Sequence, residues 1–343
     1  MMNTRQFGTD EADMREAAAL LRAGETVAFP TETVYGLGAN ALDAQAVDKI
    51  FAAKGRPSDN PLIVHIAQRS DVDKLVREIP AKAALCMDHF WPGPLTLILP
   101  VRGEVPANVT AGLDSVGIRM PDHDTALQLI DLAGVPIAAP SANSSGRPSP
   151  TTADHVREDL AGRIAGIVDG GPAGVGVEST VLDVTGEVAM ILRPGGVTRE
   201  MLEEVLGRVE IDPALEAGVG RPKAPGMKYT HYAPRGEMTL VAGAHDAERI
   251  ASLIREAHAR GQKVGVLTTE ERSNAYPEAD AVRLCGQRAD LQTVAAGLYD
   301  AIRSFDHTDV DLIYAETFSE RGVGLAIMNR LRKAAGQRVI VAD

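Results

Sequence analysis

The segment from Ala28 to Ile66 constrains the fold of this chain more than any other. A short apolar run, Thr26 to Phe29, is ended by a proline, and a polar stretch rich in threonine and glycine follows it, Thr31 to Gly38. Glycine permits the close backbone approach that a tight polar turn requires. The pattern therefore predicts a strand that leads into a functional loop.

A helix and a second strand follow this loop. Asp43 is the predicted N-cap, apolar residues recur behind it at helical spacing, and the helix ends in the sequence KGRP at positions 54–57. The next apolar run, Leu62 to Ile66, carries one histidine, His65. We therefore predict that the polar loop, the two cations and the histidine meet at one end of a sheet.

The chain has 343 residues, more than one hydrophobic core usually holds, so we expect two domains. Over residues 1–208, many short strands and only occasional helices predict an α+β domain with a twisted mixed sheet. Over residues 237–343, strands and helices alternate, which predicts a small parallel α/β domain. Residues 209–236 include a basic stretch rich in proline and glycine, which predicts a linker.

Charge and composition exclude several classes of protein. The net charge of −12 argues against an extended surface that holds nucleic acid through clustered lysine and arginine. The N-terminus is charged, and no apolar run reaches the ~20 residues of a membrane span, so we expect a cytoplasmic protein without a membrane segment. Cys86 and Cys285 lie far apart, which favours reduced thiols over the alternative of a disulfide.

Several well-known site motifs are missing from the sequence. It contains no GxxxxGK[ST] phosphate loop, no CxxC and no HExxH, so we identify no metal site made of protein side chains. The glycine-rich run from Gly170 to Thr180 lacks the third glycine of a dinucleotide-binding fingerprint and is typical of a turn between strands. A Ser-His-Asp triad stays open, but without a GxSxG elbow hydrolase chemistry has little support.

Four candidate features allow two interpretations each. Lys54 and Arg56 suit either a phosphate clamp or a basic cap at the helix C-terminus. Ser141 and Asn143 present their side chains on one face if the backbone is extended, or form a turn. His65 lies in an apolar strand, where a core histidine is more frequent than a catalytic one. Arg119, at a strand end, suits a substrate carboxylate or a surface ion pair.

Eight segments occur in an order that resolves this ambiguity: PTETVYGLG, KGRPSDNPLIVHI, WPGPLTLIL, GIRMPDH, PSANSSGRPSPT, GVESTVLD, LRPG and PGMKYTHYAP. With them the chain resembles the threonylcarbamoyl-AMP synthases of the long, two-domain YrdC-like type. Lys54-x-Arg56 and Ser141-x-Asn143 match the KxR and SxN pairs of that family, and HYAP matches the linker of its long form. The resemblance implies a first domain with a concave, positively lined cavity and a Rossmann-like second domain without a dinucleotide fingerprint.

The resemblance also implies a reaction. A nucleotidyltransferase of this family forms threonylcarbamoyl-AMP and pyrophosphate from L-threonine, bicarbonate or CO2, and ATP with Mg²⁺. The product serves the threonylcarbamoyl-adenosine modification of tRNA, so the implied partner is a downstream transferase, with direct tRNA binding weak or indirect. Because no covalent enzyme intermediate is required, catalysis would depend on positioning and on neutralising phosphate charge.

Residue roles follow from the resemblance by matching motif positions. Lys54, Arg56, Ser141 and Asn143 form the catalytic pairs. Threonine would be bound by Thr33, His65, Arg119, the backbone of Ala139, and Ser179. ATP would be bound by Arg56, Asn60, Ser115, Ser141, Ser149, Arg193 and Tyr232. The linker, with Tyr229, His231 and Tyr232, would fold over the nucleotide as a lid.

Two alternatives belong to other classes. An RNA-binding module of the same fold would lack adenylation activity, and the acidic balance counts against it. A carbamoyl-adenylate enzyme that uses carbamoyl phosphate would carry zinc-finger and acylphosphatase segments, and neither occurs in this sequence.

Overall fold

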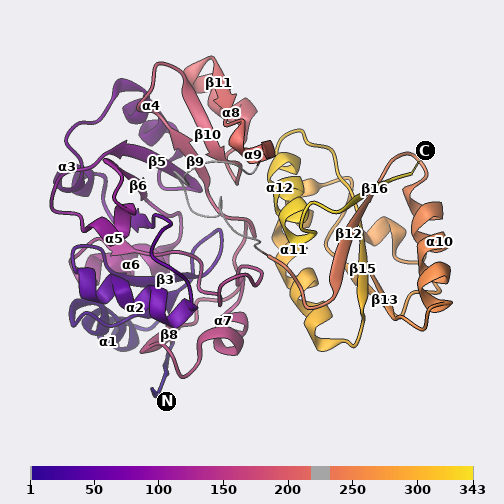
Figure 1. Ribbon diagram of the computed structural model, residues 1–343. Coiled ribbons are helices and arrows are strands. Elements are labelled where there is room, and N and C mark those ends of the chain that lie inside the picture. The colour runs from indigo at the N-terminus through magenta and orange to yellow at the C-terminus, as the bar shows by residue number, and fades with distance from the viewer. Residues whose placement is uncertain (1, 218–231, 343) are drawn as a thin grey trace. The chain divides into compact units, whose positions relative to one another are not determined.

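The computed structural model describes residues 2–217 and 232–342, and the chain divides into two compact units (Figure 1). The first unit comprises Met1–Ser145, Ser149–Gly174 and Glu178–Tyr229. The second comprises Gly146–Pro148, Val175–Val177 and Thr230–Asp343. Each unit is built around its own sheet.

The first unit contains an 11-stranded sheet in the order β1-β8-β2-β3-β7-β4-β6-β5-β9-β10-β11. Its strands are β1 (Arg5–Phe7), β2 (Val27–Phe29), β3 (Gly36–Asn40), β4 (Ile63–His65), β5 (Leu95–Pro100), β6 (Ser115–Arg119), β7 (Ile137–Ala138), β8 (Gly166–Val168), β9 (Thr180–Asp183), β10 (Ala189–Arg193) and β11 (Val209–Ile211). Strands β4 and β6 pair in parallel, whereas β2 and β3 are antiparallel, as are β5 and β6. The predicted mixed sheet is therefore confirmed.

Helices join and cover these strands. They are α1 (Glu11–Arg22), α2 (Ala44–Lys54), α3 (Val72–Leu75) preceded by the 3₁₀ turn η1 (Arg69–Asp71), α4 (Ala81–Phe90), α5 (Ala107–Thr110), α6 (Asp124–Ala133), α7 (Ala153–Leu160), α8 (Arg199–Leu206) and α9 (Ala214–Ala217). Asp43 caps α2 by accepting hydrogen bonds from the backbone of Gln45 and Ala46, and Gly55 closes the helix at φ +66°. Lys54 is thus the last residue of α2.

One part of the predicted polar turn is wrong. Gly36 to Gly38 belong to strand β3, not to a loop. A Cβ atom on Gly38 would lie 2.8 Å from the side chains of both Ile137 and Phe29, so the glycine serves close packing inside the sheet. The turn itself is confined to the residues before Gly36.

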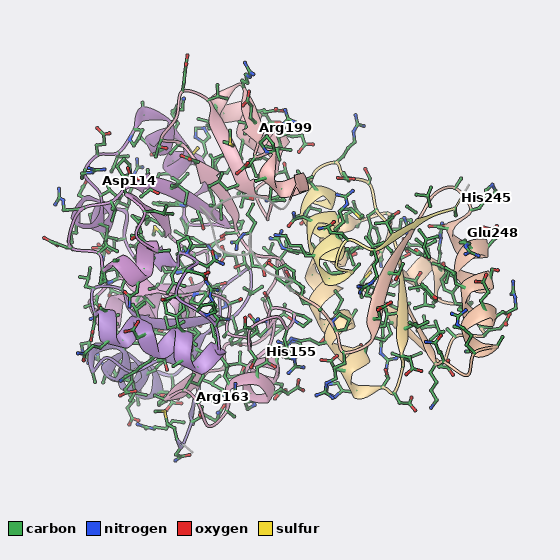
Figure 2. All side chains as sticks on the ribbon, viewed as in Figure 1. Asp114, His155, Arg163, Arg199, His245 and Glu248 are labelled. Atoms are coloured by element: carbon green, nitrogen blue, oxygen red, sulfur yellow. The ribbon has the colours of Figure 1, made fainter. Side chains whose placement is uncertain are left out.

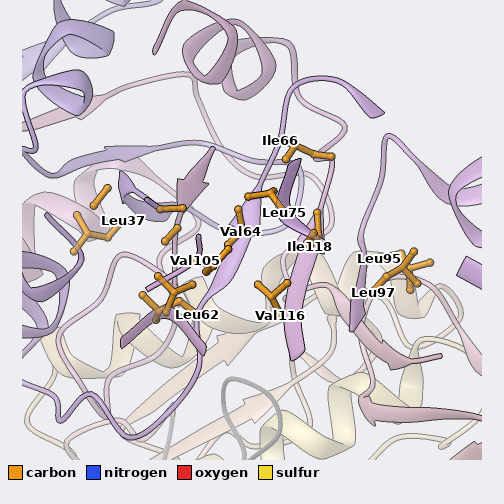
Figure 3. Close-up of a cluster of buried hydrophobic side chains, with 14 of the residues drawn as sticks. Leu37, Leu62, Val64, Ile66, Leu75, Leu95, Leu97, Val105, Val116 and Ile118 are labelled. Atoms are coloured by element: carbon orange, nitrogen blue, oxygen red, sulfur yellow. The ribbon is translucent and has the colours of Figure 1, made fainter. Parts of the chain in front are cut away.

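A large hydrophobic core lies in the first unit. Figure 3 shows part of it, where Leu37, Val64 and Ile118 come from three different strands of the sheet. Leu62 and Leu75 add side chains from the segments on either side of β4. Every one of these side chains is buried, so the ends of β4 and β6 have a rigid base.

The beginning of the predicted linker carries regular structure. Val209–Ile211 forms β11, which pairs in parallel with β10 and so extends the first sheet. Helix α9 follows it. Residues 218–231, which include most of the basic stretch, lie outside the described residues.

The second unit contains a five-stranded, all-parallel sheet in the order β14-β13-β15-β12-β16. Its elements are β12 (Glu237–Ala242), α10 (Asp246–His258), β13 (Val264–Thr268), η2 (Glu270–Arg272), β14 (Ala281–Leu284), α11 (Leu291–Ser304), η3 (Phe305–His307), β15 (Leu312–Glu316), α12 (Gly324–Ala334) and β16 (Val339–Val341). This confirms the predicted Rossmann-like domain.

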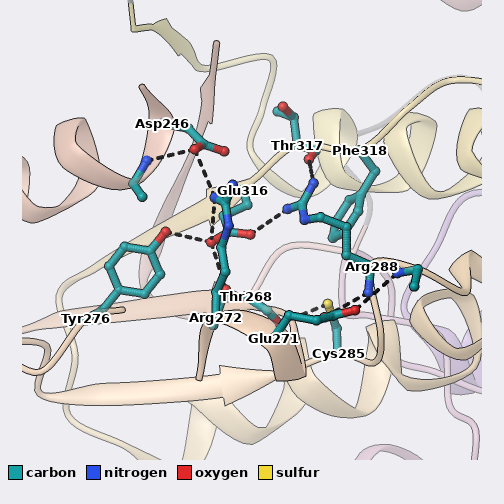
Figure 4. A network of polar contacts seen from close by, with 12 residues as sticks. Asp246, Thr268, Glu271, Arg272, Tyr276, Cys285, Arg288, Glu316, Thr317 and Phe318 are labelled. Carbon is teal, nitrogen blue, oxygen red and sulfur yellow. Dashed lines mark hydrogen bonds and ion pairs between the residues drawn. The ribbon is translucent and has the colours of Figure 1, made fainter. Parts of the chain in front are cut away.

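A buried polar network lies in the second unit (Figure 4). The carboxylate of Glu316, at the end of β15, accepts hydrogen bonds from Thr268 at 2.8 Å and from the Tyr276 hydroxyl at 2.6 Å. It also forms ion pairs with Arg272 at 3.3 Å and with Arg288 at 2.5 Å. These contacts satisfy a charge that is almost fully buried, so the network stabilises this unit.

Charges of both signs are distributed over the surface, as Figure 2 shows for Asp114, Arg163, Arg199 and Glu248, all of them exposed. Cys86 and Cys285 are both buried and free, as expected for reduced thiols. Among the described residues, no helix combines the length and apolar character that crossing a membrane would require.

Candidate active site

Arg119 is the centre of a buried polar cluster in the first unit. It ends β6, and the parallel register with β4 places it beside His65. Its Nη1 donates to Thr33 Oγ1 at 2.9 Å, and its Nε donates to the backbone oxygen of Gly93 at 3.3 Å. Its Nη2 lies 2.6 Å from Oε1 of Glu32. The structure therefore brings together three of the predicted threonine ligands, Thr33, His65 and Arg119.

The loop before β3 holds Thr33 in place through its own hydrogen bonds. The hydroxyl of Thr31 donates to the backbone oxygen of Val34 at 2.6 Å and accepts from the backbone nitrogens of Thr33 and Val34, both at 3.2 Å. Thr33 Oγ1 also lies 2.9 Å from Thr31 Oγ1. Both threonines are buried, so hydrogen bonds within the loop set the position of Thr33.

His65 is a neutral imidazole at physiological pH. Burial, and next the positive charge of Arg119, lower the pKa of His65 to about 3. The ring nitrogen Nδ1 lies 3.2 Å from the backbone oxygen of Ile63. The ring of Phe29 packs edge-on against the imidazole, with 6.1 Å between the two ring centres. The neutral ring can therefore form hydrogen bonds with a ligand, but it cannot act as a general acid near pH 7.

The KxR and SxN motifs meet through Lys54. Its Nζ donates to the backbone oxygen of Asn143 at 2.7 Å and to that of Ser141, and lies 3.4 Å from Asn143 Oδ1. Between these two residues, Ala142 points into the hydrophobic core, and its backbone nitrogen donates to Tyr35 at 2.8 Å. The lysine of one motif thus fixes the loop of the other.

Arg56 and Asn60 form a second cluster after α2. Arg56 Nη2 donates to the backbone oxygen of Asn60 at 3.1 Å, and the guanidinium lies 5.6 Å from the centre of the Phe51 ring. The side chain of Asn60 is fully buried, yet neither its Oδ1 nor its Nδ2 has a hydrogen-bond partner among the described residues. Buried amides are normally paired, so this one is available for a ligand.

Ser179 and Arg193 also contact each other. Arg193 Nη2 donates to the backbone oxygen of Ser179 at 3.0 Å and to its hydroxyl at 3.2 Å. Thr96 Oγ1 lies 2.8 Å from the same hydroxyl. The predicted threonine ligand Ser179 and the predicted ATP ligand Arg193 are therefore neighbours.

The remaining predicted residues are placed as follows. Ser149 donates to the buried carboxylate of Glu178, Ser115 begins β6, and the backbone nitrogen of Ala139 donates to Ile63 at 2.9 Å. Tyr232 belongs to the second unit, where its ring packs against Tyr299 at 5.2 Å and lies 5.8 Å from Arg330. Tyr229 and His231, the other residues of the predicted lid, lie outside the described residues.

Two carboxylates of these clusters were not predicted. Glu32 contacts Arg119, and Glu178 accepts the hydrogen bond of Ser149. Both lie inside segments that were used for the resemblance, PTETVYGLG and GVESTVLD. Their position in those segments was the only signal that could have identified them as site residues. Their contacts could not be predicted, because their partners are distant in sequence.

A pocket of about 470 Å³ opens elsewhere in the first unit. Charged residues of both signs line it, among them Asp71, Lys74, Glu104 and Asp131, and it contains none of the predicted site residues. It is therefore not the positively lined cavity that the resemblance implies. Within the described residues, no cluster of three or more His, Cys, Asp or Glu side chains suited to a metal ion is found.

Two family models match the chain. One, described as "Telomere recombination", matches residues 19–195, and one described as "Threonylcarbamoyl-AMP synthase, C-terminal domain" matches residues 197–336. The chain is 59% identical over 338 residues to the threonylcarbamoyl-AMP synthase of Bacillus subtilis, with 98% of this chain and 97% of the relative covered. It is 52% identical over 334 residues to that of Pyrococcus abyssi, with 96% of each chain covered.

A solved structure extends this similarity to the whole fold. The structure of P. abyssi Sua5 complexed with L-threonine has a TM-score of 0.93 and 49% sequence identity to this chain. The comparison covers 100% of both chains.

Proposed function

The chain belongs to the threonylcarbamoyl-AMP synthase family, and from that premise we propose how its residues join L-threonine and ATP. The alternative of an RNA-binding module without adenylation activity has no support in these relatives. Beyond the two substrates, we propose that bicarbonate or CO2 supplies the carbamoyl carbon and that Mg²⁺ accompanies the triphosphate.

Arg119, Thr33 and His65 form the threonine end of the proposed site. The buried guanidinium binds the substrate carboxylate, because a planar fork at low dielectric is the preferred partner for that group. The neutral ring of His65 and the hydroxyl of Thr33 are suited to the uncharged hydroxyl of threonine. Ser179 and the backbone of Ala139 complete this end of the site.

Arg56 and Asn60 form the ATP end. The unpartnered amide of Asn60 has one acceptor and one donor group to offer the nucleotide, and Arg56 supplies a positive charge for the phosphates. Lys54 holds Ser141 and Asn143 by their backbone oxygens, so the loop is fixed when the nucleotide binds. Ser115, Ser149, Arg193 and Tyr232 complete the proposed ATP ligands.

The proposed reaction has two steps. The amine of threonine adds to bicarbonate and releases water, which gives a carbamate. A carbamate oxygen then attacks the α-phosphorus of ATP, the bond to the β-phosphate breaks, and pyrophosphate leaves. These steps need orientation and charge neutralisation but no covalent enzyme intermediate.

Mg²⁺ fits this site as an ion carried by the phosphates. In proteins it is usually held by substrate phosphates, waters and one or two carboxylates, not by a complete protein cage. When bound, the ion would neutralise phosphate charge.

A labile mixed anhydride such as the product needs a second enzyme that transfers its threonylcarbamoyl group to tRNA. We propose that this transferase is the partner and that the reaction takes place in the cytoplasm. The net charge of −12 supports only weak or indirect contact with tRNA itself.

The observation that carries this proposal is the fully buried Asn60 amide without a partner among the described residues. The test is release of pyrophosphate from ATP in four mixtures: complete, without threonine, without bicarbonate, and with serine in place of threonine. We expect release in the complete mixture only. Equal release with serine, or without any amino acid, would overturn the proposal.

A further inference from the structure

Glu32 is a carboxylate at the threonine end of the site to which the proposed function gives no role. Its Oε1 lies 2.6 Å from Arg119 Nη2, and only 13% of its side chain is exposed. Nevertheless, neither of its oxygens has a properly oriented hydrogen bond with any residue that the structure describes, and the same holds for Arg119 Nη2. The two groups attract each other by charge, but their hydrogen-bonding capacity is unused.

The remaining donors of Arg119 show where a substrate carboxylate must bind. A guanidinium has five N–H groups. One on Nε is taken by Gly93 and one on Nη1 by Thr33, which leaves three, two of them on Nη2. A carboxylate that uses both Nη1 and Nη2 therefore arrives directly beside Glu32.

A free amino acid brings a positive charge along with its carboxylate. The two charged groups of threonine are attached to the same carbon atom, so they lie about as close together as those of Glu32 and Arg119. Pairing each substrate charge with its opposite on the protein keeps Glu32 neutralised in a buried site, where an unpaired carboxylate is costly. We infer that Glu32 binds the α-ammonium group of threonine while Arg119 binds its carboxylate, an inference that rests on the proposed function.

His123 is another titratable group within the electrostatic reach of Glu32. Burial lowers the pKa of His123 from its usual value, although the negative charge of Glu32 opposes the shift. The ring is therefore largely neutral at pH 7 and does not occupy Glu32 with a positive charge of its own. Arg119 is the cation beside Glu32, and a carboxylate ligand engages that cation.

A competing interpretation predicts the opposite sign. If Glu32 only blocked Arg119, its removal would free the guanidinium and tighten threonine binding. If Glu32 binds the ammonium, its removal weakens threonine binding and does not weaken the binding of a ligand without an ammonium.

The experiment is calorimetric binding of two ligands, L-threonine and the matching 2,3-dihydroxybutanoate, in which a hydroxyl replaces the ammonium group. The proteins are the intact wild-type chain, Glu32→Gln, Glu32→Asp, and the control Glu78→Gln, which changes an exposed carboxylate of the same unit. A hydrogen bond to a charged group predicts that the wild type prefers threonine by roughly 10-fold or more.

We expect Glu32→Gln to lose most of this preference by weakening threonine binding alone. Glu32→Asp, which keeps the carboxylate, and Glu78→Gln are expected to retain the preference. Threonine binding by Glu32→Gln that equals or exceeds that of the wild type would overturn the inference, as would an equal loss for both ligands. A wild type that does not bind threonine at all would instead overturn the proposed function.

Discussion

The ammonium group of Lys54 lies 2.7 Å from the backbone oxygen of Asn143, although the two residues are 89 positions apart in the chain. The lysine therefore does not cap its own helix, because Gly55 and the backbone of Arg56 close α2 by donating to Ala52 and Phe51. Instead it ties the end of α2 to the loop that carries Ser141 and Asn143.

Replacing Lys54 with alanine should therefore affect both stability and activity. The backbone oxygens of Ser141 and Asn143 would lose a buried charged donor, which costs about 1–3 kcal/mol of unfolding free energy. We also expect a large fall in kcat for pyrophosphate release, because the loop is no longer fixed. Urea unfolding and steady-state kinetics measure the two effects.

The control for this variant is Lys49→Ala on the same helix. Lys49 pairs with Glu25 at 2.8 Å on the surface, with 44% of its side chain exposed, so its loss should cost at most about 1 kcal/mol and leave kcat unchanged. If Lys54→Ala behaves like Lys49→Ala in both measurements, the role of Lys54 in fixing the loop is contradicted.

A substitution of Asn60 should change ATP binding without lowering the stability of the protein. Because its buried amide has no partner among the described residues, Asn60→Leu removes an unsatisfied polar group and should leave the unfolding free energy unchanged or raise it by up to about 1–2 kcal/mol. The same variant should raise the KM for ATP by roughly 10-fold, since one or two hydrogen bonds to the nucleotide are lost.

The matched control is Asn108→Leu. The amide nitrogen of Asn108 donates to the backbone oxygen of Ala44 at 2.9 Å and to the carboxylate of Asp48 at 2.8 Å, both at the surface, so this substitution should reduce stability by about 1 kcal/mol and spare the KM for ATP. An Asn60→Leu protein that is clearly destabilised but binds ATP normally would show that Asn60 has a structural role.

His65 should make stability depend on pH. Its pKa is lowered to about 3 in the folded protein and is about 6.5 in the unfolded chain, so below pH 6.5 the unfolded chain takes up a proton that the folded one does not. The contribution of the neutral His65 ring to the unfolding free energy is fully present above pH 6.5, and it is lost as the pH falls towards 3. The slope of this loss is up to about 1.4 kcal/mol per pH unit.

His65→Asn should reduce the slope of the unfolding free energy between pH 6 and pH 4 by that amount. Carboxylates also titrate in this pH range, but their contribution to the slope is the same in the wild type and the variant. It therefore cancels when the two slopes are subtracted. An unchanged slope in His65→Asn would mean that His65 is protonated in the folded protein.

A substitution of Glu316 tests how much the buried polar network contributes to the stability of the second unit. Four side chains contact the Glu316 carboxylate, and two of them are arginines. Glu316→Gln removes the buried counter-charge of both, although Arg272 keeps its ion pair with Asp246. We expect a loss of about 1–3 kcal/mol in the unfolding free energy. The exposed Glu248→Gln is the control, and equal stability of the two variants would contradict the structural role of the network (Figure 4).

The sequence predicted those elements whose signals are local. Helix α2 begins after the predicted N-cap Asp43 and ends at Lys54 as predicted, because apolar periodicity and adjacent capping residues define it without help from the rest of the chain. Strand β3 was misread because its glycines are required by Phe29 and by the distant Ile137. The short elements β1 and β11 were missed since three residues show no periodicity and their pairing partners lie elsewhere in the chain.

In the candidate site too, the features with a local sequence signal were predicted, and those that depend on distant partners were not. Motif positions such as Lys54, Arg56 and Arg119 were identified from the resemblance, but the contacts among them depend on the tertiary fold. The proximity of Glu32 to Arg119 depends on how a loop meets a strand end 87 residues later, and no local pattern encodes it.

The most direct test of the account is the composition of the adenylate product. The protein is incubated with ATP, Mg²⁺, threonine and ¹⁴C-bicarbonate, and the product is analysed by mass spectrometry and by its radioactive label. We predict one adenylate that contains threonine and the labelled carbon, formed together with one pyrophosphate. A threonyl-AMP without label, or pyrophosphate release that does not depend on bicarbonate, would contradict the account.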